Sequence, residues 1–199
     1  MVNDMTLPTM DRRAAVAKLL AARDGALVVT GLGSPSYDVH AAGDMDNNYY
    51  LWGAMGGAAL VGLGIAQAQR DRRVMVITGD GEQLMAFGAL ATIAVAAPKN
   101  LDVIVLDNQH FGETGMQPSH TGHGIALDRV AAAAGFAETA EIRSLEELGA
   151  LTKRLREPAA GPRLFVLKVE ANNLPRSLPP RDAVFVKNRF RAHLGLASC

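Results

Sequence analysis

Continuous apolar runs alternate along the chain with segments of helical character. The runs are rich in Val, Ile and Leu and predict buried strands at residues 26–30, 73–78, 101–106 and 163–169, with a short one near Phe136. Segments with helical spacing or many Ala residues predict helices at residues 12–23, 52–69, 84–97, 127–134, 145–156 and 181–193. We therefore expect a three-layer α/β/α fold, with a mainly parallel sheet covered by helices on both faces.

Three of the predicted strands end in conspicuous loops, at residues 31–36, 79–81 and 107–124. The last of these is long and polar and has neither helix nor strand periodicity. Ligands in open parallel sheets bind beyond the carboxyl ends of the strands. These loops are therefore where we expect the chemistry of the protein.

Length and composition favour one domain. The chain has 199 residues, 49% of them hydrophobic, and shows neither an internal repeat nor a low-complexity linker. We expect residues 1–199 to form a single domain, with residues 1–10 as a flexible N-terminal tail. That tail lacks the apolar centre of a signal peptide.

Charge and cysteine content exclude several classes of protein. Twenty basic and twenty acidic residues balance, without a basic cluster long enough for a nucleic-acid-binding face. The single cysteine, Cys199, allows neither an internal disulfide nor a cysteine zinc site, so we expect a reducing, cytoplasmic setting.

Two stretches, residues 47–69 and 83–98, carry no charge at all. Their apolar parts are shorter than the roughly 20 residues that a membrane-spanning helix needs, so we expect no membrane segment. They predict helices that lack a solvated face and are buried inside the domain or against another subunit.

Two motifs resemble nucleotide or calcium sites without matching them. Gly31 and Gly33 begin a dinucleotide fingerprint, but Ser36 stands at its third glycine position. Backbone amides of this loop suit a phosphate better than a complete dinucleotide. Residues 44–55 begin like a calcium loop and lack its central Gly and its final Glu, so a polar surface loop is the better interpretation.

Three histidines fall in the long loop: His110, His120 and His123. A zinc site would need a third ligand at sound spacing, which the loop does not offer. His120 and His123 are our candidates for proton transfer or for contact with an anionic substrate, and exposed histidines without a role are the alternative.

The most specific pattern joins two strand ends. Gly79-Asp80-Gly81 ends one strand, and Asp107-Asn108 ends the next. A carboxylate and an amide oxygen at neighbouring strand ends suit a hard cation such as Mg²⁺, which retains positions for ligand phosphates. The glycines allow the backbone to approach a diphosphate closely.

This pattern resembles the cofactor motif of thiamine diphosphate enzymes, usually a Gly-Asp-Gly followed by paired asparagines. The resemblance implies that Mg²⁺ is bound by the side chains of Asp80 and Asn108 and by the backbone carbonyl of His110. It also implies diphosphate contacts from the amides of Gly81 and Glu82. The remaining residues that we expect at the cofactor are Gly33, Ser34 and Gly79 along the diphosphate, and Gly53 and Met55 along the aminopyrimidine.

By the same resemblance the Gly53 carbonyl accepts from the 4′-amino group, and the bulky Met55 bends the cofactor into its V shape. Two departures from the motif stand out. Asp107 replaces the first asparagine, although it is not a metal ligand in the motif. Glu82 stands where a serine or alanine is usual, and its carboxylate would repel the diphosphate unless it points away.

Further segments, at residues 32–36, 49–57, 79–85 and 114–120, resemble sulfopyruvate decarboxylase beta subunits and the matching half of phosphonopyruvate decarboxylases. Such enzymes need a second domain type that grips the pyrimidine and supplies a glutamate. A chain of this length has room only for the diphosphate-binding, PP-type domain, so an alpha-type partner in a hetero-oligomer is implied. The uncharged helices are candidate docking surfaces.

The function implied is decarboxylation of a small anionic 2-oxo acid, such as 3-sulfopyruvate or 3-phosphonopyruvate, to an aldehyde and CO2. Residues 108–112 also resemble the loop of acetolactate synthase, so carboligation is an alternative. A non-catalytic module that binds thiamine diphosphate is a third possibility.

Overall fold

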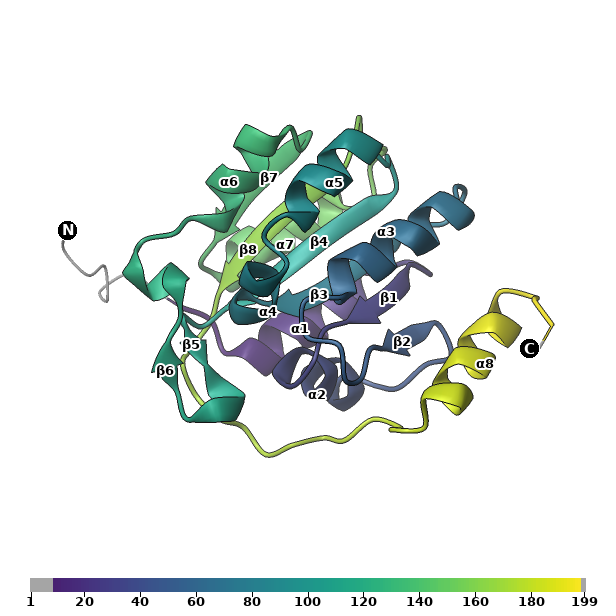
Figure 1. Cartoon of the computed structure of the whole chain (residues 1–199), viewed down its shortest axis with the longest axis horizontal. Coiled ribbons are helices and arrows are strands. Elements are labelled where there is room, and N and C mark those ends of the chain that lie inside the picture. The colour runs from purple at the N-terminus through teal and green to yellow at the C-terminus, as the bar shows by residue number, and fades with distance from the viewer. Residues whose placement is uncertain (1–8, 198–199) are drawn as a thin grey trace.

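The protein was analysed as a computed structural model that describes residues 9–197. A six-stranded sheet forms its centre, with the strand order β2-β1-β3-β4-β8-β7 and every neighbouring pair parallel (Figure 1). The strands are β1 (Leu27–Thr30), β2 (Asn48–Tyr50), β3 (Val74–Gly79), β4 (Leu101–Asp107), β7 (Glu138–Ile142) and β8 (Arg163–Lys168). The expected parallel sheet is thereby confirmed.

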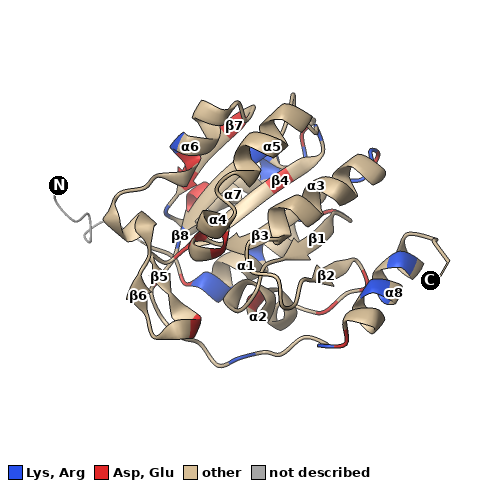
Figure 2. Cartoon of the chain, in the orientation of Figure 1, with Lys and Arg blue, Asp and Glu red and all other residues tan. Residues whose placement is uncertain are grey.

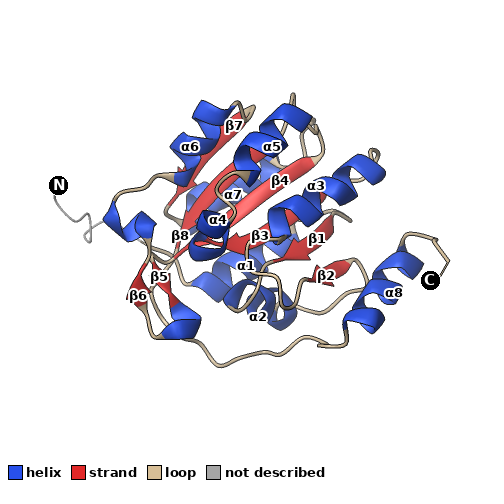
Figure 3. Cartoon of the chain, viewed as in Figure 1, coloured by secondary structure: helices blue, strands red, loops and turns tan. Residues whose placement is uncertain are grey.

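Helices cover both faces of this sheet (Figure 3). One apolar core lies between the sheet and α1 (Arg12–Ala21), α2 (Ser34–Ala41) and α7 (Leu145–Arg154). A second core lies on the other face, against α3 (Ala58–Ala68), α5 (Ala89–Ala96) and α6 (Leu127–Ala134). This arrangement explains the continuous apolar runs in the sequence, because both faces of the sheet are buried.

Several expected boundaries were wrong, each for a local reason. The stretch after Gly33 holds α2, a polar helix with Pro35 in its first turn, and the three-residue edge strand β2. Neither has a hydrophobic period long enough to detect. α3 begins at Ala58 and not at residue 52, because Gly56 has a φ of +90° that no helix accommodates.

The expected helix at residues 84–97 is two helices. α4 (Asp80–Met85) begins directly at the end of β3, and α5 follows after a break at residues 86–88. The long polar loop also has structure of its own. It forms a small antiparallel hairpin of β5 (His110–Phe111) and β6 (Gln117–Pro118), with the 3-10 turns η1 (Gly112–Thr114) and η2 (His120–His123).

Both ends of the described chain are held against the sheet. Met10 is buried beside β8, where its amide donates to the Lys168 carbonyl at 3.0 Å. The expected tail therefore does not extend to residue 10, and residues 1–8 lie outside the described part. At the other end, α8 (Ala183–His193) covers the edge strand β2, with Phe190 edge-on to Tyr49. Within the described residues, no helix is long and apolar enough to cross a membrane.

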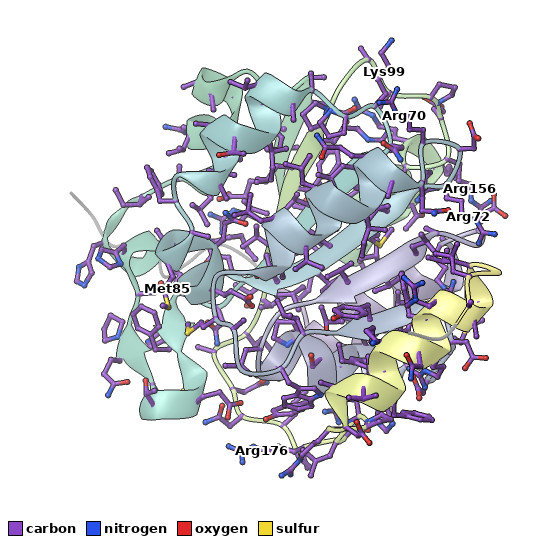
Figure 4. The ribbon with its side chains drawn as sticks, turned by 45° about the vertical axis from the view of Figure 1, so that its right-hand side comes forward. Arg70, Arg72, Met85, Lys99, Arg156 and Arg176 are labelled. Atoms are coloured by element: carbon purple, nitrogen blue, oxygen red, sulfur yellow. The ribbon has the colours of Figure 1, made fainter. Side chains whose placement is uncertain are left out.

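Exposed basic side chains gather at the amino ends of the strands. Arg70, Arg72, Lys99 and Arg156 lie together there, whereas Met85 lies at the opposite end beside the β5–β6 hairpin (Figure 4).

Candidate cofactor site

A cavity of about 190 Å³ opens at the carboxyl ends of the central strands. Its walls come from the turn that joins β3 to α4, from the hairpin that follows β4, and from the start of α2. This position agrees with the general rule for ligands of open parallel sheets. The cavity brings together most of the residues singled out in the sequence.

Eight of the expected site residues line the cavity: Ser34, Met55, Gly79, Asp80, Gly81, Glu82, Asn108 and His110. Gly33 lies just beside them as the N-cap of α2, with a φ of +77° that favours glycine. Gly53 does not line the cavity. His120 and His123 do not line it either, and their side chains are exposed on η2.

Asp80 is the most perturbed carboxyl group of the site. Its side chain is almost fully buried, and its Oδ2 accepts from the hydroxyls of Ser119 and Thr121, the latter at 3.0 Å. Burial and the nearby charge of Asp107 raise the pKa of Asp80 to about 6, although the two hydroxyl bonds lower it. An ionised Asp80 is therefore costly in the free protein and would gain from a cation.

Asp107 is buried next to Asp80 but does not line the cavity. Its Oδ2 accepts from the Lys168 ammonium at 2.6 Å, and its Oδ1 accepts from the Thr121 hydroxyl at 2.8 Å. Asp107 and Lys168 are register partners on adjacent strands. The carboxylate that departs from the motif is thus neutralised by a cation from β8.

Asn108 and His110 form a tight turn at the cavity wall. The Asn108 Oδ1 accepts from the His110 amide at 3.0 Å, and Gln109 between them has a φ of +62°. Asp80 and Asn108 both line this cavity, so the site contains one carboxylate and one amide side chain. This donor set fits a hard cation such as Mg²⁺. In the described part of the chain no group of three His, Cys, Asp or Glu side chains could hold a metal, so backbone and amide oxygens would have to complete the coordination.

Glu82 connects two segments of the site. Its Oε2 accepts from the Leu32 amide at 2.9 Å and its Oε1 accepts from the Gly56 amide at 3.3 Å. Burial raises the pKa of Glu82, and these amide bonds oppose that rise. The carboxylate therefore ties the loop after β1 to the segment that contains Met55, which gives the unusual residue a structural role.

We expect Gly31→Ala to weaken this connection. A Cβ at residue 31 would overlap with the Oε2 of Glu82, so the carboxylate must leave the two amides that it binds. The free energy of unfolding should fall by about 1–3 kcal/mol, as measured by urea denaturation. Gly64→Ala in α3 is the matched control, because a Cβ there meets open space. Equal effects of the two substitutions would contradict the role of Glu82.

Together, the parallel sheet and this cavity define an α/β protein with a ligand site beyond the carboxyl ends of its central strands. Residues 34–169 match the family model of the thiamine pyrophosphate enzymes' C-terminal TPP binding domain. The chain belongs to this family, as the sequence resemblance implied.

Relatives and solved structures agree with this membership. The chain is 40% identical over 121 residues to sulfopyruvate decarboxylase subunit beta of Methanocaldococcus jannaschii, which covers 61% of this chain and 63% of the relative. It is 40% identical over 185 residues to phosphonopyruvate decarboxylase of Streptomyces viridochromogenes, covering 91% of this chain and 45% of the relative. The chain thus spans less than two thirds of the length of either relative.

A similar fold occurs in a putative thiamin diphosphate-dependent enzyme from Mycobacterium smegmatis. The TM-score is 0.69 at 23% identity, over 85% of this chain and 34% of that one. A thiamine diphosphate-dependent 4-hydroxybenzoylformate decarboxylase of Rhodococcus jostii gives a TM-score of 0.68 at 19% identity, over the same shares. These likenesses concern the fold alone.

Two features of the site have no sequence signal of their own. Arg12, far from every motif, lines the cavity from α1, and Glu113 lines it from η1. Their positions depend on how distant segments pack, which residue spacing does not express.

Proposed function

We propose that this chain is the diphosphate-binding, beta-type subunit of a heteromeric 2-oxo acid decarboxylase that depends on thiamine diphosphate and Mg²⁺. Its substrate would be a small anionic 2-oxo acid such as 3-sulfopyruvate or 3-phosphonopyruvate, and its products an aldehyde and CO2. The proposal rests on one observation: Asp80 and Asn108, from two neighbouring strand ends, line a single cavity together with Gly81 and Ser34. Relatives named as decarboxylases support the reaction class.

In this proposal each segment of the cavity has one task. The side chains of Asp80 and Asn108 and the carbonyl of His110 hold Mg²⁺ against the diphosphate. Backbone groups at Gly33, Ser34, Gly79, Gly81 and Glu82 surround the diphosphate. Met55, which lines the cavity, and Gly53, which does not, would orient the aminopyrimidine, and the bound cofactor would supply the electron sink for decarboxylation.

Exposed apolar side chains along α4, α5 and the break between them support the need for a partner. Met85, Phe87 and Val95 are 64%, 45% and 88% exposed, and all three lie on the uncharged stretch 83–98. Figure 2 shows α3 and α5 almost without Lys, Arg, Asp or Glu along the face toward the viewer. Uncharged helices with large exposed apolar side chains are typical of a protein interface. We assign it to the alpha-type subunit that would supply the pyrimidine-binding domain and the glutamate.

Val95→Glu is expected to weaken this association, because a buried, unpaired carboxylate at an interface is strongly unfavourable. Co-purification with the co-expressed partner should drop at least about tenfold, equivalent to about 1.4 kcal/mol. Val184→Glu on α8, which is 60% exposed, is the control and should leave co-purification unchanged. If both variants retain the partner equally well, the docking surface lies elsewhere.

His120 and His123 remain candidates for proton transfer or substrate binding within this proposal. Because both are exposed on η2, they would meet the substrate only once the partner covers that side. A cytoplasmic setting also remains part of the proposal and rests on the single cysteine at the C-terminus.

The proposal is tested in two stages. Calorimetry on the full chain with its co-expressed partner should detect thiamine diphosphate binding that requires Mg²⁺. Product analysis with 3-sulfopyruvate, 3-phosphonopyruvate and pyruvate then separates the functions. An aldehyde plus CO2 supports decarboxylation, acetolactate from pyruvate would indicate a carboligase, and cofactor binding without any product would indicate a non-catalytic module.

A further inference from the structure

One cationic side chain enters the cavity from outside the cofactor motif. Arg12, the first residue of α1, is 3% exposed and lines the same cavity as Asp80 and Asn108. Over residues 9–197 it is the only Lys or Arg among the residues that line this cavity. A buried arginine at a ligand cavity is costly unless its charge is used or paired.

The partners of Arg12 leave part of its charge available. Its Nε donates to Asp38 Oδ2, and its Nη1 donates to the Asn172 carbonyl at 3.2 Å. Asp38 is completely buried, and its other carboxylate oxygen accepts from the Arg13 Nε at 3.2 Å. Two arginines thus share one aspartate, so the cluster carries a net positive charge. Within the described residues, the Nη2 of Arg12 has no hydrogen-bond partner.

The position of Arg12 favours one end of the cavity. The segment that binds its Nη1 continues to Asn173, whose Oδ1 is 3.2 Å from where a Cβ on Gly112 would lie. The Nδ2 of Asn108 is 4.0 Å from that same point. Arg12 is therefore anchored through a segment that reaches the cavity wall at Gly112, beside Asn108, where the proposed cation and diphosphate lie.

We propose that Arg12 binds the terminal phosphate of the diphosphate and is held for that task by Asp38. This inference rests on the proposed function. Arg12 is the one Lys or Arg among the described residues that line the cavity, and a diphosphate brings more negative charge than one divalent cation neutralises. A guanidinium fixed at Nε and Nη1 presents its remaining N–H groups in a rigid geometry that suits phosphate oxygens.

The test is calorimetry of thiamine diphosphate binding in excess Mg²⁺, with thiamine monophosphate measured by competition. Arg12→Gln should weaken thiamine diphosphate binding about 10- to 100-fold, the range of a charge-assisted hydrogen bond. Binding of the monophosphate, which lacks the terminal phosphate, should change less than about threefold, below the effect of one such bond. Arg12→Lys should fall between the wild type and Arg12→Gln.

Arg13→Gln is the matched control, because Arg13 shares Asp38 but does not line the cavity. It should weaken binding of thiamine diphosphate less than Arg12→Gln does, because it removes charge from the cluster but no group that lines the cavity. Should Arg12→Gln fail to fold, the double substitution with Asp38→Asn replaces the buried carboxylate that has lost one of its two arginines, and it should show the same selective loss. Thermal unfolding without cofactor monitors the fold of each variant.

The outcomes separate the two proposals. Wild-type affinity in Arg12→Gln, equal losses for diphosphate and monophosphate, or an equal loss in Arg13→Gln would each overturn the role of Arg12 while the wild type still binds the cofactor. A wild type that binds no thiamine diphosphate with Mg²⁺ would overturn the proposed function, and the role of Arg12 with it.

Discussion

Asp80→Asn is expected to abolish Mg²⁺-dependent binding of thiamine diphosphate and also to stabilise the cofactor-free chain at neutral pH. The two effects have the same cause. Asp80 is almost fully buried beside Asp107, and burial followed by that charge raises its pKa to about 6. An asparagine can still accept from Ser119 and Thr121 through its amide oxygen, but it carries no charge to bind a cation. At pH 7.5 the free energy of unfolding should rise by about 2–3 kcal/mol, from the size of the pKa shift.

The pH dependence of unfolding gives the same prediction a distinct signature. The folded-state pKa of Asp80, about 6, is above the value of 3.8 for an unperturbed aspartate, so the folded state retains the proton in that interval. Stability from this group is therefore greatest below about pH 4 and is lost as the pH rises to about 6. Urea denaturation of the cofactor-free wild type should show this decline, and Asp80→Asn should lack it.

Other buried carboxyl groups do not confuse this comparison. The pKa values of Glu82 and Asp102 are also raised by burial, and they contribute equally to the wild type and the variant. The difference between the two pH profiles therefore reports on Asp80 and on its interaction with the charge of Asp107. Parallel profiles would contradict this prediction, and so would an Asp80→Asn chain that is less stable than the wild type at pH 7.5. Either result would show that the ionised Asp80 does not destabilise the cofactor-free chain.

The elements with the strongest hydrophobic pattern could be predicted from the sequence. β3, β4 and β8 are continuous apolar runs, and each of their expected boundaries lies within one residue of the boundary in the structure. The site followed from them, because Asp80 and Asn108 stand at strand ends that a parallel sheet places side by side. α2 and β2 could not be predicted, since a short polar helix and a short edge strand bury too little to leave a period in the sequence.

Departures from the cofactor motif were visible in the sequence, but the contacts that accommodate the unusual side chains were not. Glu82 was expected to repel a diphosphate unless its side chain points away, and in the structure its carboxylate accepts from two backbone amides. Arg12 was placed on an ordinary helix, and its position in the cavity depends on Asp38 and on the chain at Asn172. Contacts of this kind join segments that are far apart in the sequence, and spacing within a motif contains no information about them.

Asp107 is the other departure from the motif, and its compensating partner is Lys168. Lys168→Met is therefore expected to be among the most damaging single substitutions. Lys168 is 6% exposed and Asp107 is 3% exposed, and their charged atoms are 2.6 Å apart. Removing the ammonium leaves a buried carboxylate without its cation, which should lower the free energy of unfolding by about 3–5 kcal/mol. Urea denaturation measures the loss. Arg176→Met is the control, because its ion pair with Glu113 is largely exposed and should contribute less than about 1 kcal/mol.

The double substitution of Asp107→Asn with Lys168→Met should recover most of that stability, since an asparagine oxygen can still accept from Thr121 and from the Gln109 amide. Asp107→Asn also removes a negative charge from beside Asp80 and should lower the pKa of Asp80. Mg²⁺-dependent cofactor binding should then persist to lower pH than in the wild type. A double variant no more stable than Lys168→Met would mean that the lysine acts through packing and not through charge. In that case the carboxylate that replaces the first asparagine of the motif would not depend on the charge of Lys168.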